Sequence, residues 1–404
     1  YTNYIFGSKE IASDTSSQKY RDTTFIANLD EDGNFLVNKY KINFSPDLIY
    51  ANAGYSTLYG LLGTTVLSFS DMLGNHRLVG VTSLQVDLKN SDYGLAYYYL
   101  PERIDYGFEG FHTARFIYIN RGQGSQLYRY RNFGFVASAS YPLSRFYRLE
   151  GSLSYLNVSS ENLDNYNDPT EKVSYVIPSI GFVHDNTFWG YYSPIEGSRY
   201  RITFFGNPGI GSSQHSFYST VWDFRQYYRF WFDNGFAMRF SGGISGGNNP
   251  QRFFLGGVDN WINRSFASGD IPIESTSDFA FLTPGLPMRG FDYGEKIGTK
   301  YSLLNLELRV PLIRYLVTGP LPLLFQNILG SIYFDAGTAW NYNKQLQLFS
   351  KNENGNTVTK DLLMGTGIGL RMYFIFLWKF DFAWAYNVEG FSKPRFYLSI
   401  GTDF

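Results

Sequence analysis

VWDFRQYYRFWF, residues 221–232, decides the fold, because its side chains alternate between two kinds. Successive side chains of a β-strand point to opposite faces of the sheet, so one face of this strand is apolar and the other is mainly ionic. The apolar face carries Trp222, Phe224, Tyr228, Phe230 and Phe232, and the opposite face carries Asp223, Arg225, Tyr227 and Arg229. Alternation alone also fits a soluble β-sandwich. The length favours a membrane strand, since globular strands mostly have about 5–6 residues and a tilted membrane strand needs about 9–11.

Similar segments follow one another along most of the chain, separated by Gly, Asn, Pro and Ser residues that are typical of turns. The predicted strands are 47–56, 61–71, 75–88, 92–100, 104–119, 125–141, 145–158, 171–184, 198–207, 214–232, 235–246, 300–313, 325–341, 360–374, 376–388 and 392–403. An even number of strands is typical of single-chain outer-membrane barrels. We therefore predict an all-β fold, an antiparallel transmembrane β-barrel of about sixteen strands over residues 46–404, with a long loop at 247–299. Residues 1–45 are more polar and predict a periplasmic linker or arm, with a disordered terminus as the alternative.

The composition supports this class of protein. Aromatic residues make up 19% of the chain and charged residues only 17%, whereas globular domains carry roughly 25% charged residues. A membrane barrel displays aromatic side chains to lipid and keeps polar groups in its lumen. The net charge of −1 gives no field that would attract nucleic acid, and no run of about 18 apolar residues predicts a transmembrane helix.

Two further features of the sequence concern the compartment. The chain has no cysteine, which excludes disulfides and thiolate chemistry and suits passage through an oxidising periplasm. It starts at Tyr1 without Met, a basic region or an apolar signal segment. We therefore expect either a removed signal peptide or the tail of a longer protein.

The segment PMRGF (287–291) lies in the long loop, ahead of two strands that carry acidic residues. In YSLLNLELRVPL (301–312) the leucines alternate with Asn305, Glu307 and Arg309, and in GSIYFDAGTAW (330–340) Asp335 lies opposite the apolar face. Alternation therefore predicts that Glu307 and Asp335 point into the lumen. A guanidinium removed from bulk water needs a carboxylate partner, so Arg289 on an inward-folded loop would meet one of them. On an extracellular loop it would simply be solvated.

This ordered set of motifs resembles the barrel of the BamA-like superfamily of outer-membrane assembly and secretion proteins, the bacterial surface antigen family. The resemblance implies that the loop folds back into the lumen and that an acidic residue on a barrel strand holds its tip, Arg289, Gly290 and Phe291. The FDAG surroundings make Asp335 the first candidate for that partner and Glu307 the second. The glycine would permit close approach of the tip to the barrel wall.

Two segments upstream of the tip share the resemblance. In VHDNTFWGYYSPIEGSRYRITFF (183–205), Asp185, Pro194 and Gly197 stand where the family has Asp and then Pro-x-x-Gly before a strand. Residues 194–197 predict a turn between two strands, and an ordinary hairpin turn is the alternative interpretation. FFLGGVDNW (253–261) is similar to the family's Gly-Gly segment, although about 27 residues between Trp261 and the tip make this loop longer than usual.

The two ends of the barrel region also resemble family sequences. RFYLSIGTDF (395–404) is similar to the signal by which outer-membrane proteins are recognised for folding, with Phe396, Leu398, Ile400 and Phe404 on one face. GYSTLYGLLGTTVLSFSDMLGNH (54–76) is similar to barrels of the superfamily that are fused behind a TolB-like β-propeller. Family members more commonly carry POTRA domains at that place, and this chain has no segment of their length and pattern.

The residues give no support for an enzyme. His76, His112, His184 and His215 are scattered without an HExxH motif, and His184 and Asp185 are neighbours on a strand and so face opposite ways. No GxSxG motif or P-loop occurs, and the glycine-rich SGGISGGNN (241–249) lacks the GK[ST] ending. We expect no catalytic site, no metal and no cofactor.

The resemblance implies an integral protein of the bacterial outer membrane that inserts or translocates other polypeptides. The first and last strands would meet at a seam that carries Gly54 and Gly401, and glycines weaken strand pairing. An openable seam would expose N–H and C=O groups that template an incoming strand. The expected partners are outer-membrane lipid, client outer-membrane or secreted polypeptides, and periplasmic domains or lipoproteins. Two other functions stay open, a passive pore or transporter and a barrel that anchors a periplasmic, propeller-like domain.

Overall fold

A computed structural model describes residues 40–57, 60–83, 90–120, 124–165, 167–190, 193–210, 215–231, 234–269, 271–273, 275–317, 324–351 and 355–404. The chain divides into two units, Tyr1–Ile42 and Asn43–Phe404, and the structural findings concern the second unit. Residues 1–39 of the predicted arm lie outside the described residues, so the division at residues 45 and 46 stays a prediction.

The second unit is built on one sheet of 18 strands, in which β9 (Phe188–Trp189) and β22 (Gly390–Phe391) have only two residues each. The sixteen others pair antiparallel in the order of the chain. They are β1 (Ser45–Ser56), β2 (Gly60–Ser70), β3 (His76–Ser83), β4 (Asp92–Tyr99), β5 (Asp105–Asn120), β6 (Ser125–Pro142), β7 (Tyr147–Asn162), β8 (Glu171–Asp185), β10 (Pro194–Asn207), β11 (Phe217–Phe230), β12 (Asn234–Gly247), β16 (Lys300–Val317), β17 (Leu324–Trp340), β20 (Leu363–Phe374), β21 (Phe376–Asn387) and β23 (Arg395–Ile400). Each overlaps one predicted strand, and the all-β fold is confirmed.

The outer face of this sheet is apolar, as the alternation predicts. On β11, Tyr218, Tyr228 and Phe230 are exposed, whereas Phe217 and Tyr227 are buried on the opposite face. Exposed apolar side chains recur on the other strands, among them Phe108, Phe133, Leu153, Ile180, Phe204, Phe240, Ile332, Ile368, Phe382 and Phe396. A soluble protein would bury such residues, so this face is suited to lipid.

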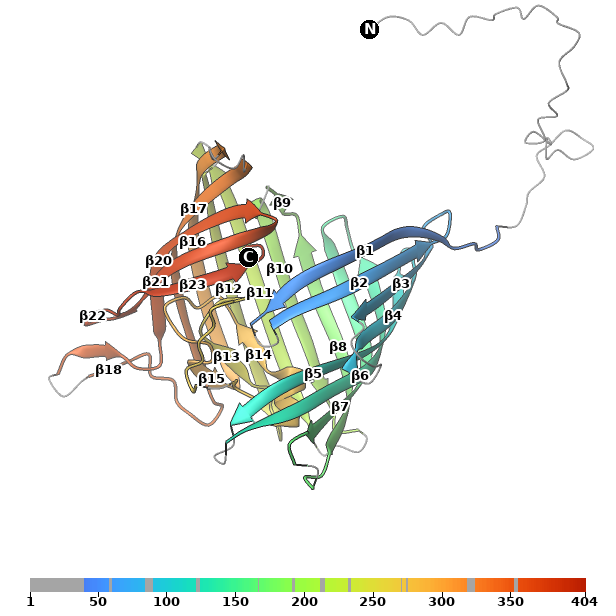
Figure 1. Ribbon diagram of the computed structural model, residues 1–404, viewed down its shortest axis with the longest axis horizontal. Helices are drawn as coiled ribbons and strands as arrows, with labels where there is room; N and C mark the ends of the chain where they lie inside the picture. The colour runs from blue at the N-terminus through green and yellow to red at the C-terminus, as the bar shows by residue number, and fades with distance from the viewer. Residues whose placement is uncertain are drawn as a thin grey trace, which may run out of the picture. The chain divides into compact units, whose positions relative to one another are not determined.

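The long loop between β12 and β16 lies inside the curved sheet (Figure 1). It contains a three-stranded sheet of β13 (Phe253–Leu255), β14 (Thr283–Gly285) and β15 (Lys296–Gly298), with β13 in the middle. All three residues of β13 are fully buried. The loop therefore supplies a core that the strands surround, and the expected lumenal loop is present.

One short helix, α1 (Thr276–Phe281), was not predicted. Its Ser275 cap and Asp278 form a capping box, and six residues are too few to show a helical period. The helix packs against β6, β7 and β8, and its Phe279 stacks on Tyr130 of β6 with ring centroids 4.7 Å apart. In the described part of the chain, no helix is both long and apolar enough to cross a membrane. A separate hairpin pairs β18 (Phe349–Lys351) with β19 (Thr357–Thr359).

The sheet stays open between its first and last strands. Within the described residues, β1 pairs only with β2 and β23 only with β21 among the strands, and no pairing joins β1 to β23. The last strand ends at Ile400 instead of residue 403, because Gly401 adopts φ of 118° and turns the chain away. The predicted turn at residues 194–197 is wrong, since these residues already form the start of β10.

Candidate functional site

The loop tip places Arg289 against the two neighbouring strands β16 and β17. Its Nε donates to Oδ2 of Asp335 at 2.7 Å and its Nη2 to Oδ1 at 2.9 Å, and its main-chain N–H donates to Oδ2 at 3.0 Å. Nη1 donates to Oε2 of Glu307 at 3.2 Å. The side chains of these three residues are 2%, 0% and 1% exposed. Bidentate pairs of this kind are strong hydrogen bonds, so the tip is fastened to the wall.

Arg289 with its partners Asp335 and Glu307 forms an arginine clamp. Two further side chains support it. Asn305 lies directly opposite Asp335 in the register of β16 and β17, and its Nδ2 donates to Asp335 at 2.7 Å and to the carbonyl oxygen of Pro287 at 2.8 Å. The ring of Tyr333 lies under the guanidinium, with Cζ of Arg289 3.4 Å from the ring centre. These side chains meet because of the strand period. Asn305 and Glu307 on β16, like Tyr333 and Asp335 on β17, are two positions apart and therefore all face the lumen.

Glycines make room for the tip. Gly290 has φ of 99°, and a Cβ on it would lie 2.9 Å from the main-chain nitrogen of Ala385. On β20, a Cβ on Gly365 would overlap the carbonyl oxygen of Arg289. A Cβ on Gly367 would lie 2.5 Å from the Tyr333 hydroxyl. Gly365 and Gly367 of this strand therefore leave lumenal space that the tip and its supporting ring fill.

The tip also reaches the last strand of the sheet. Tyr397 of β23 accepts a hydrogen bond from the N–H of Gly290 at 2.8 Å and donates one to the carbonyl oxygen of Phe291 at 2.9 Å. The Phe291 ring packs against the buried cluster that includes Phe253 and Met288. The Arg-Gly-Phe tip is thus held by side chains of β16, β17 and β23.

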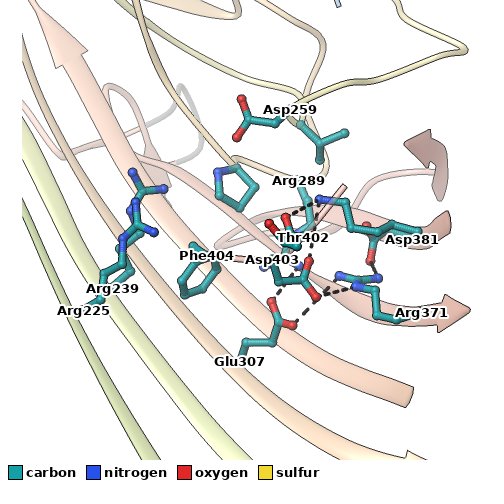
Figure 2. A pocket seen from close by; sticks show the side chains of 13 residues that line it. Arg225, Arg239, Asp259, Arg289, Glu307, Arg371, Asp381, Thr402, Asp403 and Phe404 are labelled. Carbon is teal, nitrogen blue, oxygen red and sulfur yellow. Dashed lines mark hydrogen bonds and ion pairs between the residues drawn. The ribbon is translucent and has the colours of Figure 1, made fainter. Parts of the chain in front are cut away.

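A second set of charged side chains lies beside the clamp (Figure 2). Arg371 donates to Asp381 at 2.7 Å and to Asp403 at 2.7 Å, and Arg309 donates to Glu307 at 3.2 Å. Together with the clamp, the cations are Arg289, Arg309, Arg371 and Lys379, and the carboxylates are Asp335, Glu307, Asp381 and Asp403. Positive and negative charges are therefore balanced, which offsets the cost of removing them from water. Several of them line a cavity of about 210 Å³.

The final residues of the chain, 402–404, line the same cavity. The strand before them, β23, keeps the predicted alternation. Its Tyr397 and Ser399 are buried, and Phe396, Leu398 and Ile400 lie on the outer face as predicted.

The placement predicted for Phe404 on that outer face is wrong. Its ring centre lies 5.4 Å from the guanidinium of Arg309, and its main-chain oxygen accepts from Nη2 of Arg309 at 2.9 Å. The cause is the turn at Gly401, which ends the strand before the pattern ends. The role of these residues in recognition for folding stays a prediction.

The upstream motif lies at the connection between β8 and β10. Asp185 ends β8 and is 3.3 Å from Nε of Arg199. Pro194 begins β10, and its carbonyl oxygen accepts from Nη1 of Arg309 at 3.2 Å. Gly197 has φ of 99°, and a Cβ there would lie 2.5 Å from a neighbouring carbonyl oxygen. The structure therefore brings Pro194 to the charged cluster and leaves Asp185 at the strand end.

The two predicted seam glycines lie in different surroundings. Gly54 is within β1, opposite Leu62 of β2. Gly401 follows β23, and its N–H donates to the carbonyl oxygen of Leu377 at 2.9 Å. Gly401 therefore shapes a turn and does not weaken a strand pair.

Several residues of the site were not predicted from the sequence. They are Tyr333, Tyr397, Gly365, Arg371 and Asp403. The glycines at positions 365, 367 and 369 of β20 were a usable signal, because three successive lumenal positions without a side chain leave room for another segment. In the described residues, no three His, Cys, Asp or Glu side chains gather as metal ligands would.

An antiparallel sheet of sixteen strands with an apolar outer face, curved around a charged lumenal loop and open between β1 and β23, defines an integral β-barrel protein of the outer membrane. The family model of the Omp85 superfamily domain matches residues 81–404, and the chain belongs to this superfamily. The expected resemblance is thereby confirmed. The superfamily places the protein in outer-membrane protein insertion or secretion, and members of the superfamily act in transport and assembly.

One solved structure supports the fold, and two others are similar at lower TM-scores. BamA from Haemophilus ducreyi lacking POTRA domains 1–3 is similar with a TM-score of 0.57 at 16% identity, over 91% of this chain and 71% of that one. CdiB from Acinetobacter baumannii is 15% identical with a TM-score of 0.47, over 89% of this chain and 60% of that one. CdiB from Escherichia coli is 13% identical with a TM-score of 0.49, over 92% and 64%. No curated protein matches the sequence.

Proposed function

We propose that this barrel inserts or translocates polypeptides by offering strand edges at its open side, between β1 and β23. The observation that carries the proposal is the missing pairing between these two strands in the described part of the sheet. Backbone groups that face hydrocarbon must find partners within protein. An unpaired strand edge therefore favours the addition of an extended segment from another chain.

The length of β1 suits this role. It has 12 residues and pairs on one side with β2 over its whole length, and a tilted membrane strand needs about 9–11. A strand added along its other edge would be long enough to cross the membrane. The clients are outer-membrane or secreted polypeptides, with periplasmic domains or lipoproteins as further partners.

The arginine clamp has a supporting role in this proposal. The tip binds Asp335 and Glu307 on β16 and β17 and also Tyr397 on β23. These strands form the wall on one side of the opening. A wall fastened to a rigid loop keeps its shape while the neighbouring edge exchanges partners.

The packed lumen disfavours a passive pore. Phe253, Phe254 and Leu255 of the loop are fully buried inside the sheet. The anchor alternative depends on segments outside the described residues. The experiment that tests the proposal also distinguishes the passive pore and the anchor from it.

The test reconstitutes the purified chain into liposomes and adds a small outer-membrane barrel unfolded in urea. Folding of this probe is followed by its gel mobility without heating. We expect faster folding than in liposomes that contain a porin at the same protein-to-lipid ratio. Equal folding rates would refute the proposal. Steady ion conductance without assistance would then support a pore, and a tightly held co-purifying partner without conductance would support an anchor.

A further inference from the structure

A short segment of the lumenal loop, residues 260–263, lies along the free edge of β23. Trp261 and Ser399 form an antiparallel bridge. The N–H of Ile262 donates to the carbonyl oxygen of Leu398 at 2.8 Å, and the N–H of Ile400 donates to that of Asn260 at 3.4 Å. The segment therefore binds the last strand as a neighbouring strand would.

Two asparagine side chains extend this pairing at both ends. Nδ2 of Asn260 donates to the carbonyl oxygen of Ile400 at 2.9 Å. Asn263 accepts from the N–H of Leu398 at 2.8 Å through Oδ1 and donates to the carbonyl oxygen of Phe396 at 2.9 Å through Nδ2. A side-chain amide offers the same donor and acceptor as a peptide group. The edge is thus covered from Phe396 to Ile400 by a segment too short to be a strand itself.

Trp261 of this segment, with Val258 and Arg264 on either side of it, also holds the end of the first strand. The N–H of Trp261 donates to Oγ1 of Thr57 at 2.9 Å, and Oγ1 of Thr57 donates to the carbonyl oxygen of Val258 at 3.4 Å. Arg264 donates to the carbonyl oxygen of Thr57. Thr57 directly follows the last residue of β1 and is buried. Both strands that border the opening are therefore tied to one loop segment.

A strand edge accepts one neighbour at a time, because paired strands lie about 4.7–4.9 Å apart. Residues 260–263 and β1 therefore cannot pair with the same part of β23 together. We propose that residues 260–263 are a displaceable cap that holds the seam open, and that β1 replaces them on β23 when the barrel closes. This inference rests on the proposed function and adds a regulatory element to the same opening.

β1 is the occupant of the edge for two reasons. Among the sixteen strands that pair in chain order within the described residues, it is the other one that has a strand partner on one side only. The contacts of Thr57 also keep its end beside the cap. The cap in turn touches the arginine clamp, since the Trp261 ring packs on Tyr397 and Tyr397 binds the tip at Gly290. Release of the cap would therefore remove the packing of Trp261 on Tyr397, the side chain that binds the tip.

The chain has no cysteine, so engineered pairs can report which partner occupies the edge. Ser399→Cys with Trp261→Cys reports the capped state, because such a pair flanked by two hydrogen bonds has its Cα atoms about 4.5 Å apart and within reach of a disulfide. Ser399→Cys with single cysteines placed in turn along β1 reports the closed state. Both sets are oxidised in the full chain reconstituted in liposomes.

The variant that weakens the cap carries the two substitutions Asn260→Gly and Asn263→Ala. It removes the three side-chain hydrogen bonds to β23 and the one that Nε1 of Trp261 donates to Asn263, and it keeps a residue suited to the φ of 54° at position 260. We expect the ratio of closed to capped cross-links to rise about tenfold. Asn343→Ala, on an exposed loop far from the cap in sequence, is the matched control and should leave the ratio unchanged. Should the double variant fail to fold, Asn263→Asp keeps the acceptor for Leu398 and should give a smaller rise.

The inference is overturned if no position in β1 cross-links to residue 399 in either background, or if the ratio is the same with and without the cap asparagines. The readout needs no client polypeptide. A protein that switches its seam without assisting a client would therefore refute the proposed function and leave the cap in place.

Discussion

The ring of Tyr397 packs against the ring of Trp261, with centroids 4.7 Å apart and planes inclined by 44°. The hydroxyl of Tyr397 accepts from Gly290 and donates to the carbonyl oxygen of Phe291. One side chain of β23 therefore contacts both the cap on its own edge and the tip that is clamped to β16 and β17. This contact joins the two parts of the loop at the opening of the sheet.

Tyr397→Phe should weaken this junction. The ring stays, but the buried N–H of Gly290 loses its acceptor, which costs about 1–3 kcal/mol. The measurement is the urea midpoint of the purified barrel, followed by gel mobility without heating. Tyr155→Phe is the control, since that side chain is 41% exposed on the outer face, and its effect should stay within about 0.5 kcal/mol. Equal midpoints for the two variants would contradict the role given to the hydroxyl.

Arg289→Ala should destabilise the barrel strongly. It leaves the buried Asp335 without its cation, and breaking a buried pair costs about 3–5 kcal/mol. Arg148→Ala is the control, because Arg148 is 45% exposed and pairs with Glu150 at 2.7 Å, where an exposed pair contributes about 0–1 kcal/mol. A double-mutant cycle with Asp335→Ala should be clearly non-additive. Additive losses would mean that the two side chains act independently.

The ring of Tyr333 should stabilise the barrel through the contact of its face with the guanidinium of Arg289. Tyr333→Phe keeps the ring 3.4 Å from Cζ of Arg289 but removes the hydrogen bond to the carbonyl oxygen of Phe382. Tyr333→Leu removes the ring as well. We expect Tyr333→Leu to unfold at lower urea than Tyr333→Phe, by about 2 kcal/mol for a desolvated cation–π contact. If the two variants unfold at the same urea concentration, the ring serves only to fill space.

The strands could be predicted because their signal is local. Alternation depends on neighbouring residues only, so it placed Glu307 and Asp335 in the lumen without knowledge of the fold. The motif then suggested Arg289 as their partner, and the structure has this contact. What the clamp contributes to activity stays a prediction.

The parts that could not be predicted depend on contacts between distant residues. The apolar pattern of β23 continues to Phe404, but the turn at Gly401 sends that residue into the lumen, where Arg309 binds it. The cap at residues 260–263 has no period of its own, since two of its four residues bind through side chains. Its pairing with β23 joins positions more than a hundred residues apart, which no local pattern records.

Gly365→Ala tests whether the fit of the tip to the wall matters as much as its charges. The added methyl group would overlap the carbonyl oxygen of Arg289, so the tip or β20 must shift. Overpacking of this kind costs about 1–3 kcal/mol. Gly151→Ala on β7 is matched, because a Cβ there meets nothing within 4 Å and neither glycine has a positive φ. We expect Gly365→Ala alone to lower the urea midpoint and to increase protease cleavage within the loop 248–299. A shift of the midpoint without added cleavage would mean that β20 moves and the tip stays docked, and equal behaviour of the two variants would exclude the close contact between glycine and tip.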